Sequence, residues 1–273
     1  MKIRLKELIL RVIDRMTVVR AVLGNLTRTR KTKPLEIAGL TFGTPLGTAP
    51  GCDTNASFYN TLASFGASFV IVGPTELKPS DRCCGVHALI KNLKERRCKA
   101  IIGGAVNCCR SDHNTDSRNI ETTFAMLYDF VDFIVLCPDA DKEMSTIDES
   151  FTDIADNVLS LRLFYEQYKP LFLRIPTGIS ISQIEDLLLY CLSSGIDGVV
   201  VDKQLVAFVK EKSESRLTIM ATVDSQTDTA SVNEILADGA SLIAFSTCSS
   251  ERIDISLATF RHHINAAPQL SVN

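Results

Sequence analysis

The chain has 273 residues, of which 45% are hydrophobic and 22% are charged, a composition that allows one large domain or two small ones. It excludes a disordered or collagen-like chain. The formal net charge is −3, Trp is absent and Tyr occurs five times, so the chain has neither the excess positive charge nor the stacking rings of a general nucleic-acid-binding protein, and we expect no nucleic-acid partner.

The first 33 residues differ in charge from the rest of the chain. They hold ten Lys/Arg against two acidic residues, a net charge of +8, whereas the remaining 240 residues carry a net charge of −11. The basic residues lie off an apolar stripe with helical spacing, which comprises Leu5, Leu8, Ile9, Val12, Ile13, Met16, Val19 and Leu23. The pattern predicts an amphipathic basic helix or helix pair over residues 1–24, followed by a solvated connector up to residue 33.

Two placements of this N-terminal extension stay open. It is suited to the headgroup region of an anionic membrane surface, where each nearby Lys or Arg adds about 1 kcal/mol of attraction. A terminal helix docked on the domain would show the same pattern. No uninterrupted apolar run reaches the roughly 18 to 20 residues that span a bilayer, so we expect no membrane crossing.

Nine cysteines occur without a secretory signal peptide, and four of them form the adjacent pairs Cys83/Cys84 and Cys108/Cys109. This usage is typical of thiols in a reducing cytosol. Adjacent pairs do not reproduce the C-x2-C unit of zinc and iron–sulfur sites, so no metal site is predicted. The expected location is cytoplasmic, with peripheral attachment to the inner face of the membrane if the extension meets lipid.

From residue 46 onward, short apolar runs alternate with amphipathic segments. The runs predict eight strands, at Leu46–Pro50, Ser68–Gly73, Ala100–Val106, Phe133–Cys137, Leu171–Ile175, Gly198–Asp202, Thr218–Val223 and Leu242–Thr247. Predicted helices between them include Phe58–Phe65, Arg118–Phe130, Asp153–Tyr168 and Ile181–Ser193. Eight such units in about 230 residues favour an α/β fold, a (β/α)8 TIM barrel over residues 34–273, with residues 1–33 as its amphipathic helical extension.

Chemistry in such a barrel lies at the carboxyl ends of the strands. The residues expected there include Cys137, Arg174 and the carboxylates Asp139, Asp202 and Asp224. Cys137 is either a small buried hydrophobe or a reactive thiol. Arg174 is expected to form an ion pair with Asp139 or Asp202.

Several segments carry a family resemblance. The sequence LEIAGLTFGTPLGTAPGCD at residues 35–53 resembles the start of the dihydroorotate dehydrogenases, where a small β-hairpin caps the barrel and an A-A-G-x-D-K turn closes on the flavin. Residues 197–200 and 237–243 look like the family's strand-six and strand-eight entries, so the resemblance covers about residues 35–265. The extension is similar to the membrane-associating helices of class 2, quinone-reducing members.

The resemblance implies oxidation of dihydroorotate to orotate, in which a base removes a proton, a hydride passes to FMN and an acceptor such as quinone reoxidises the flavin. Cys137 matches the catalytic base of class 1 members. If FMN is retained, its binding residues include Ala49 and Gly51 of the flavin turn, and Arg174, which stands where the family places a Lys beside flavin N1.

Other positions depart from the family pattern. Thr54 replaces a flavin-contacting Lys and Pro74 replaces a Thr, while Gly104 and Ile134 stand where the family has Asn. The two glycine turns that cradle the FMN phosphate become Val223-Asp224-Ser225 and Ser246-Thr247-Cys248. Asp224 places a like charge near a phosphate dianion, which disfavours binding.

Two functions follow. The preferred one is a dihydroorotate dehydrogenase-like barrel that has lost FMN and its oxidation reaction and acts as a binding or interaction protein, within a homo- or hetero-oligomer. The alternative is an active FMN-dependent oxidoreductase of pyrimidine biosynthesis with an altered pocket, so enzymatic activity stays open. A barrel that uses Cys137 for unrelated chemistry is a third possibility.

Overall fold

The computed structural model of this protein describes residues 34–108, 117–138, 149–224 and 227–246. Eight parallel strands close into a barrel in the order β10-β3-β4-β5-β6-β7-β8-β9. The strands are β3 (Leu46–Asp53), β4 (Phe69–Thr75), β5 (Ile101–Asn107), β6 (Phe133–Cys137), β7 (Leu171–Arg174), β8 (Gly198–Asp202), β9 (Thr218–Asp224) and β10 (Leu242–Ser246). All eight predicted strands and the (β/α)8 TIM barrel are confirmed, whereas the extension over residues 1–33 lies outside the described residues.

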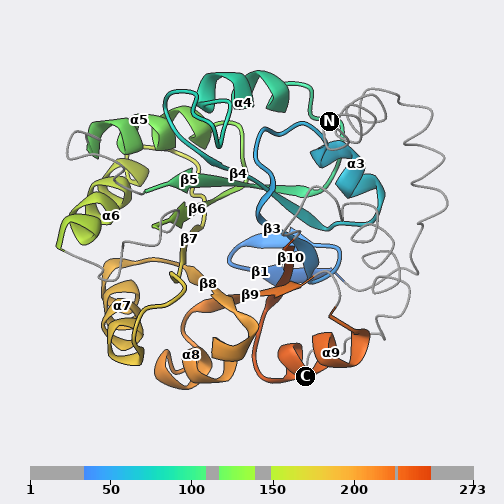
Figure 1. Cartoon of the computed structure of the whole chain (residues 1–273), viewed down its shortest axis with the longest axis vertical. Coiled ribbons are helices and arrows are strands. Elements are labelled where there is room, and N and C mark those ends of the chain that lie inside the picture. The colour runs from blue at the N-terminus through green and yellow to red at the C-terminus, as the bar shows by residue number, and fades with distance from the viewer. Residues whose placement is uncertain (1–33, 109–116, 139–148, 225–226, 247–273) are drawn as a thin grey trace.

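Helices surround the strands as an outer layer (Figure 1). They are α3 (Tyr59–Ser64), α4 (Val86–Leu93), α5 (Ser117–Tyr128), α6 (Glu149–Arg162), α7 (Ile181–Ser194), α8 (Val206–Lys212) and α9 (Thr229–Ala237), with a short 3₁₀ helix at Lys203–Leu205. The start of α7 is fixed by a capping box, in which Ser180 Oγ accepts from the Gln183 amide and Gln183 reaches back to the Ser180 amide.

Helix α6 is shorter than the predicted segment Asp153–Tyr168, because it ends at Arg162. The amides of Leu163, Phe164 and Tyr165 donate to carbonyls three residues back, so the last turn tightens and the helix stops. Both Leu163 and Phe164 are then more than 80% exposed. The apolar residues after Arg162 therefore did not continue the helix.

Side chains alternate between the inside of the barrel and the helix layer along each strand. On β4, Phe69 and Ile71 join the cluster inside the barrel, whereas Val70 and Val72 pack with the helices. The same alternation holds on the other strands and fixes which residue at each strand end faces the barrel axis.

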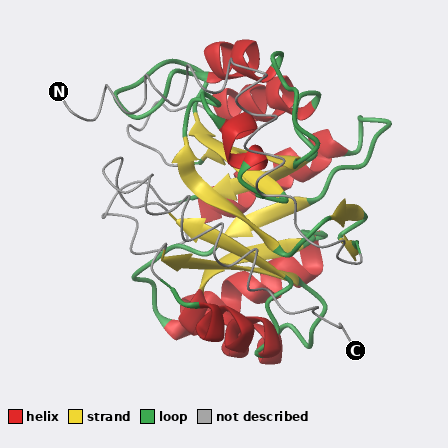
Figure 2. Ribbon diagram, turned by 90° about the vertical axis from the view of Figure 1, so that its right-hand side faces the viewer, coloured by secondary structure: helices red, strands yellow, loops and turns green. Residues whose placement is uncertain are grey.

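The amino end of the barrel is closed by a two-stranded antiparallel hairpin, β1 (Leu35–Ile37) and β2 (Leu40–Phe42), as the resemblance implied. Figure 2 shows this hairpin at the end of the barrel away from the strand arrowheads. Its Phe42 ring packs edge-on against Phe69 at a centroid distance of 5.8 Å. The hairpin thereby removes the apolar interior from solvent at this end.

A row of phenylalanine rings crosses the barrel interior above the hairpin. Phe133 lies between Phe69 and Phe172, with centroid distances of 6.4 and 5.4 Å. Glycines on the paired strands make the space, since a Cβ on Gly103 would overlap the Phe133 ring and one on Gly47 would overlap Phe69. The barrel is thus a packed core at this level and not a channel.

A polar network also ties the amino ends of the strands to the helix layer. Asp197, just before β8, accepts hydrogen bonds from Arg162 Nη1 at 2.7 Å, from the Leu171 amide at 2.8 Å and from the Tyr168 hydroxyl. Arg162 is 9% exposed, and its Nη2 also donates to the Gly195 carbonyl. This carboxylate therefore joins α6, β7 and β8 through one side chain.

Candidate functional site at the barrel mouth

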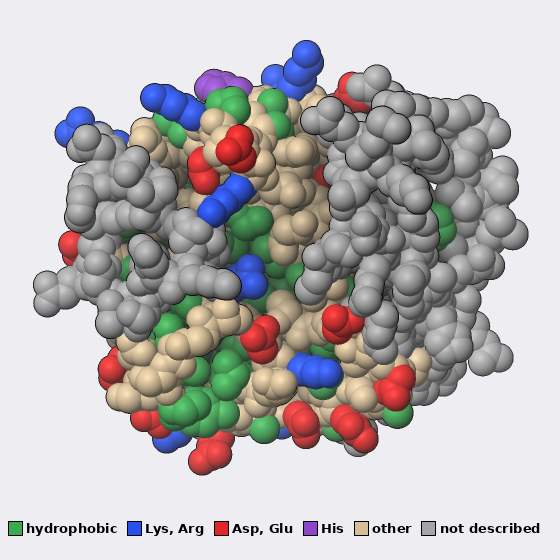
Figure 3. All heavy atoms as spheres, viewed as in Figure 1, with side chains coloured by type: hydrophobic (Ala, Val, Ile, Leu, Met, Phe, Trp, Pro, Cys, Tyr) green, Lys and Arg blue, Asp and Glu red, His purple; other side chains and the backbone are tan. Residues whose placement is uncertain are grey.

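The carboxyl ends of the strands form the mouth of the barrel, which faces the viewer in Figures 1 and 3. Polar residues replace the apolar ones of the interior there. Because inward positions are two residues apart, the residues that follow the interior cluster are Asn107, Arg174, Asp202, Thr222, Asp224 and Ser246. Acidic and basic side chains lie close together near the middle of this face (Figure 3). The interior is thus apolar at the amino end and polar at the mouth.

Asn107 and Cys137 lie opposite each other on β5 and β6, in register. Asn107 Nδ2 donates to Glu76 Oε1 at 2.7 Å, which fixes both side chains just above the end of β4. Cys137 belongs to the apolar interior cluster and is fully buried. Its thiol is therefore covered in this structure, which agrees with the small-hydrophobe interpretation of this cysteine.

Arg174 ends β7 and lies in register with Val200 of β8, so it shares the inward face and is half-buried at the mouth. The predicted ion pair with Asp202 is wrong. Asp202 Oδ1 instead accepts a hydrogen bond from Thr222 Oγ1 at 2.8 Å, because these two residues are in register on β8 and β9. The other predicted partner, Asp139, lies outside the described residues.

Asp224 and Ser246 occupy the next strand ends, where they are in register on β9 and β10. Ser246 Oγ donates to the Val223 carbonyl at 3.1 Å, and Asp224 is exposed. Three carboxylates, those of Glu76, Asp202 and Asp224, therefore stand around the mouth with the guanidinium of Arg174.

The opposite side of the mouth is formed by the end of β3, four strands from β7. Ala49 is buried in the interior cluster, and Gly51 is exposed with φ of +95° and open space where a Cβ would stand. Asp53 is fully buried and accepts from the amides of Ser57 at 2.7 Å and Phe58 at 3.0 Å. This carboxylate thus orients the turn that leads into α3.

No protein-family model matches the chain. Among curated proteins it is similar to the dihydroorotate dehydrogenase (quinone) of Idiomarina loihiensis, with 24% identity over 201 residues that cover 62% of this chain and 60% of the relative. The corresponding protein of Christiangramia forsetii is 25% identical over 208 residues, covering 66% of this chain and 61% of the relative. The matches therefore span about 60% of the length of these relatives.

At this low identity the chain is similar to the dihydroorotate dehydrogenases. The fold agrees, since the ligand-free enzyme of Eimeria tenella superposes with a TM-score of 0.71 at 17% identity, over 90% of this chain and 92% of that one. Its complex with ferulenol gives a TM-score of 0.72 at 16% identity, over 90% and 89%. At these identities the structures establish the barrel fold alone.

Gly104 and Ile134, which stand where the family pattern has Asn, do not face the mouth. A Cβ on Gly104 would point at Leu127 of α5, and Ile134 packs in the helix-side cluster. The amide that β5 presents to the mouth is that of Asn107. The alternation of Gly103, Ala105 and Asn107 along β5 is the signal that identifies this amide from the sequence.

The predicted site residues thus divide in two. Cys137, Arg174, Gly51 and the end of β3 meet at one mouth, whereas the segments with Asp139, Ser225 and Thr247-Cys248 lie outside the described residues. Within the described part of the chain, no three His, Cys, Asp or Glu side chains converge as metal ligands. The seven cysteines that the structure describes are thiols that form no disulfide bond.

Proposed function

We propose that this dihydroorotate dehydrogenase-like barrel has lost FMN-dependent oxidation of dihydroorotate to orotate and works as a binding or interaction protein. The observation that carries the proposal is the pair of strand ends at β9 and β10. In the family pattern, glycine turns after these two strands hold the FMN phosphate. Here β9 ends in the exposed carboxylate of Asp224, in register with Ser246.

The change at these strand ends has a large energetic consequence for FMN binding. A phosphate dianion leaves water only if backbone N–H donors replace its hydration, and a charged group without such partners costs several kcal/mol. Asp224 adds like-charge repulsion at the same place, and Asp202 lies on the neighbouring strand. Since each 1.4 kcal/mol is a factor of about ten in affinity, the loss of three good contacts weakens FMN binding about a thousandfold.

The state of Cys137 supports the same conclusion. A general base must come within hydrogen-bond reach of the proton that it removes, and this thiol is fully buried among apolar side chains. The replacements Thr54 and Pro74 at the ends of β3 and β4 remove two further flavin contacts of the family pattern.

The test is the flavin content and the activity of the purified full chain. We expect a colourless protein and no dihydroorotate-dependent reduction of an acceptor dye. Stoichiometric FMN would contradict the proposal. So would dye reduction that disappears in Cys137→Ala but persists in Cys191→Ala, a matched substitution of a buried thiol on α7, outside the mouth.

The second candidate is an active FMN-dependent oxidoreductase of this family with an altered pocket. The observation that favours it is that Gly51 and Arg174, two of the residues that would hold FMN in the family pattern, lie on opposite sides of the same mouth. The assays of flavin content and dye reduction decide between the two functions, because they give opposite results for each.

The membrane is the proposed location of the N-terminal extension, on the strength of its sequence pattern and a net charge of +8 over residues 1–33. In the described residues, no helix is long and apolar enough to cross a bilayer. Cosedimentation with anionic vesicles should be lost when residues 1–33 are deleted. Binding that is unchanged by the deletion, or absent in the full chain, would contradict this placement and leave the helix a structural element of the domain.

A further inference from the structure

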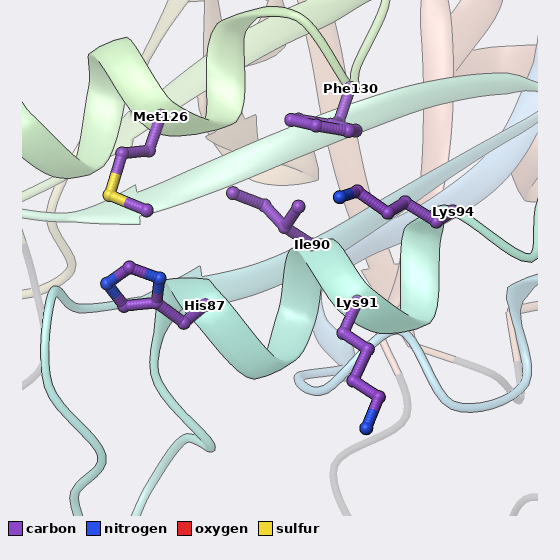
Figure 4. Close-up of a pocket in the computed structure, with 6 residues that line it drawn as sticks. All are labelled: His87, Ile90, Lys91, Lys94, Met126 and Phe130. Carbon is purple, nitrogen blue, oxygen red and sulfur yellow. The ribbon is translucent and has the colours of Figure 1, made fainter.

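A groove runs between α4 and α5 on the outside of the barrel, away from the mouth. It has a volume of about 400 Å³ and is lined by His87, Ile90, Lys91, Lys94, Met126 and Phe130. Figure 4 shows Ile90 between the two helices, with Met126 and Phe130 on the α5 side and Lys94 pointing toward Phe130. The groove thus has an apolar floor and nitrogen-bearing side chains along one wall.

The α4 wall is basic. His87, Lys91 and Lys94 recur at a spacing that keeps them on neighbouring turns, and Val86–Leu93 contains no acidic residue. The Lys94 ammonium lies 5.6 Å from the centroid of the Phe130 ring. Three acidic residues lie near this wall: Asp132 is already paired with Arg96 at 2.8 Å, while Asp129 and Glu95, the residue after Lys94, are exposed. The basic character of the wall therefore comes from α4, through the exposed Lys91 and Lys94, on a domain whose overall charge is negative.

We propose that this groove docks an acidic amphipathic helix of a partner protein. Its apolar residues would lie on Ile90, Met126 and Phe130, and its Asp or Glu side chains would pair with Lys91 and Lys94. This goes beyond the function proposed for the mouth and is independent of FMN, because the groove and the mouth share no residue.

The dimensions and the charge both favour this occupant. His87 and Lys94 are seven residues apart on α4, which is about 10 Å or two helical turns, the length over which an amphipathic helix presents anchors at i, i+3, i+4 and i+7. Three of the six lining residues, His87, Lys91 and Lys94, are exposed at the rim, whereas a small-molecule pocket encloses most of its ligand. The chain's own basic extension is excluded, because ten Lys/Arg over residues 1–33 would meet a basic wall.

The experiment uses the full chain and a fluorescently labelled helical peptide of about 16 residues, long enough to form a helix on binding. The peptide carries Leu at i, i+3, i+4 and i+7 and Glu at its other exposed positions, and a matched peptide carries Lys in place of each Glu. We expect saturable binding of the acidic peptide only. Lys94→Glu and Met126→Gln should each weaken it about tenfold or more, whereas Lys210→Glu on α8 should change it less than about twofold.

Each other outcome overturns the proposal. If the two peptides bind equally well, or if Lys94→Glu and wild type bind the acidic peptide equally well, the groove is not the docking site. Lys94-dependent binding to anionic vesicles without peptide binding would identify a lipid surface as the occupant. A dimer in sedimentation velocity that Lys94→Glu dissociates would identify a second copy of the chain. Thermal unfolding of each variant separates these results from a loss of folding.

Discussion

At the amino end of the barrel, phenylalanine rings, paired glycines and a hairpin fill the interior, whereas at the carboxyl end the same strands present amide, guanidinium, carboxylate and hydroxyl groups. Phe133 packs between two rings and is fully buried. Asp224, at the other end, is exposed. The relatives of this chain share the fold, so the packed end is the part that the fold requires, and the mouth is the part that sequence change could alter.

This comparison predicts that the two ends respond differently to substitution. Side chains at the packed end contribute to stability through burial and through a polar network around the nearly buried guanidinium of Arg162. Side chains at the mouth contribute to what the barrel binds.

Phe133→Ala should lower the free energy of unfolding by about 3–5 kcal/mol, because it leaves a cavity between Phe69 and Phe172 that the glycine-lined strand cannot fill. Guanidinium denaturation of the full chain measures the change. Phe164→Ala is the matched control, since this ring is 85% exposed and its loss should cost less than about 0.5 kcal/mol. Similar losses for both variants would mean that the phenylalanine row does not hold the barrel together.

Asp197→Ala should cost about 3 kcal/mol, because it leaves the nearly buried guanidinium of Arg162 without its carboxylate. It also removes an acceptor from the Leu171 amide at the start of β7. Asp238→Ala, an exposed carboxylate at the end of α9, should stay within about 0.5 kcal/mol of wild type. A small effect at position 197 would show that solvent or another acceptor replaces the carboxylate.

The same network predicts a loss of stability at high pH. Burial, together with the hydrogen bond to Asp197 and its charge, raises the pKa of Tyr168 to about 12. Because the folded pKa lies above the ordinary value of 10, the protonated tyrosine stabilises the fold fully below pH 10, and this contribution is lost as the pH rises through 12. Denaturation midpoints should be measured between pH 9 and 12, a range that brackets the ordinary and the folded pKa of this tyrosine. With rising pH, the midpoint should fall less steeply for Tyr168→Phe than for wild type. The same pH dependence in both proteins would show that Tyr168 does not cause the loss of stability.

Substitutions at the mouth should have the smallest effect on stability. Thr222→Val removes one hydrogen bond to Asp202 and should cost about 1 kcal/mol. Arg174→Ala and Asp224→Ala should each stay within about 1 kcal/mol of wild type, because both side chains are at least partly exposed. A cost of 3 kcal/mol or more, as large as that of a buried pair, would show that the mouth is a structural element and not a binding surface.

The sequence predicted the fold well because the signal is repeated. Each of the eight apolar runs reports a strand on its own, and the segments between them are long enough for a crossover helix. The end of α6 was missed because Leu163 and Phe164 continue the apolar pattern, although they are exposed in the structure. Composition does not reveal that a helix tightens at its last turn.

The mouth was only partly predictable. Which residues stand at strand ends follows from the runs themselves, so Cys137 and Arg174 were placed correctly. The direction of the side chains was not predicted, because Gly104 and Ile134 were compared with family positions without regard to which face of the strand they occupy. Hydrogen-bond partners were not predicted either. Thr222 donates to Asp202 because the two residues are in register on β8 and β9, and sequence spacing does not reveal this register.

Titration of FMN with the full chain tests the central claim most directly. Flavin fluorescence should show no saturable binding up to about 100 μM FMN, in keeping with a loss of about a thousandfold in affinity. Asp224→Asn, which removes only the like charge, should leave binding weak. One-to-one saturation by the wild-type chain with a Kd of about 1 μM or below would contradict the account and restore the flavin to the mouth of this barrel.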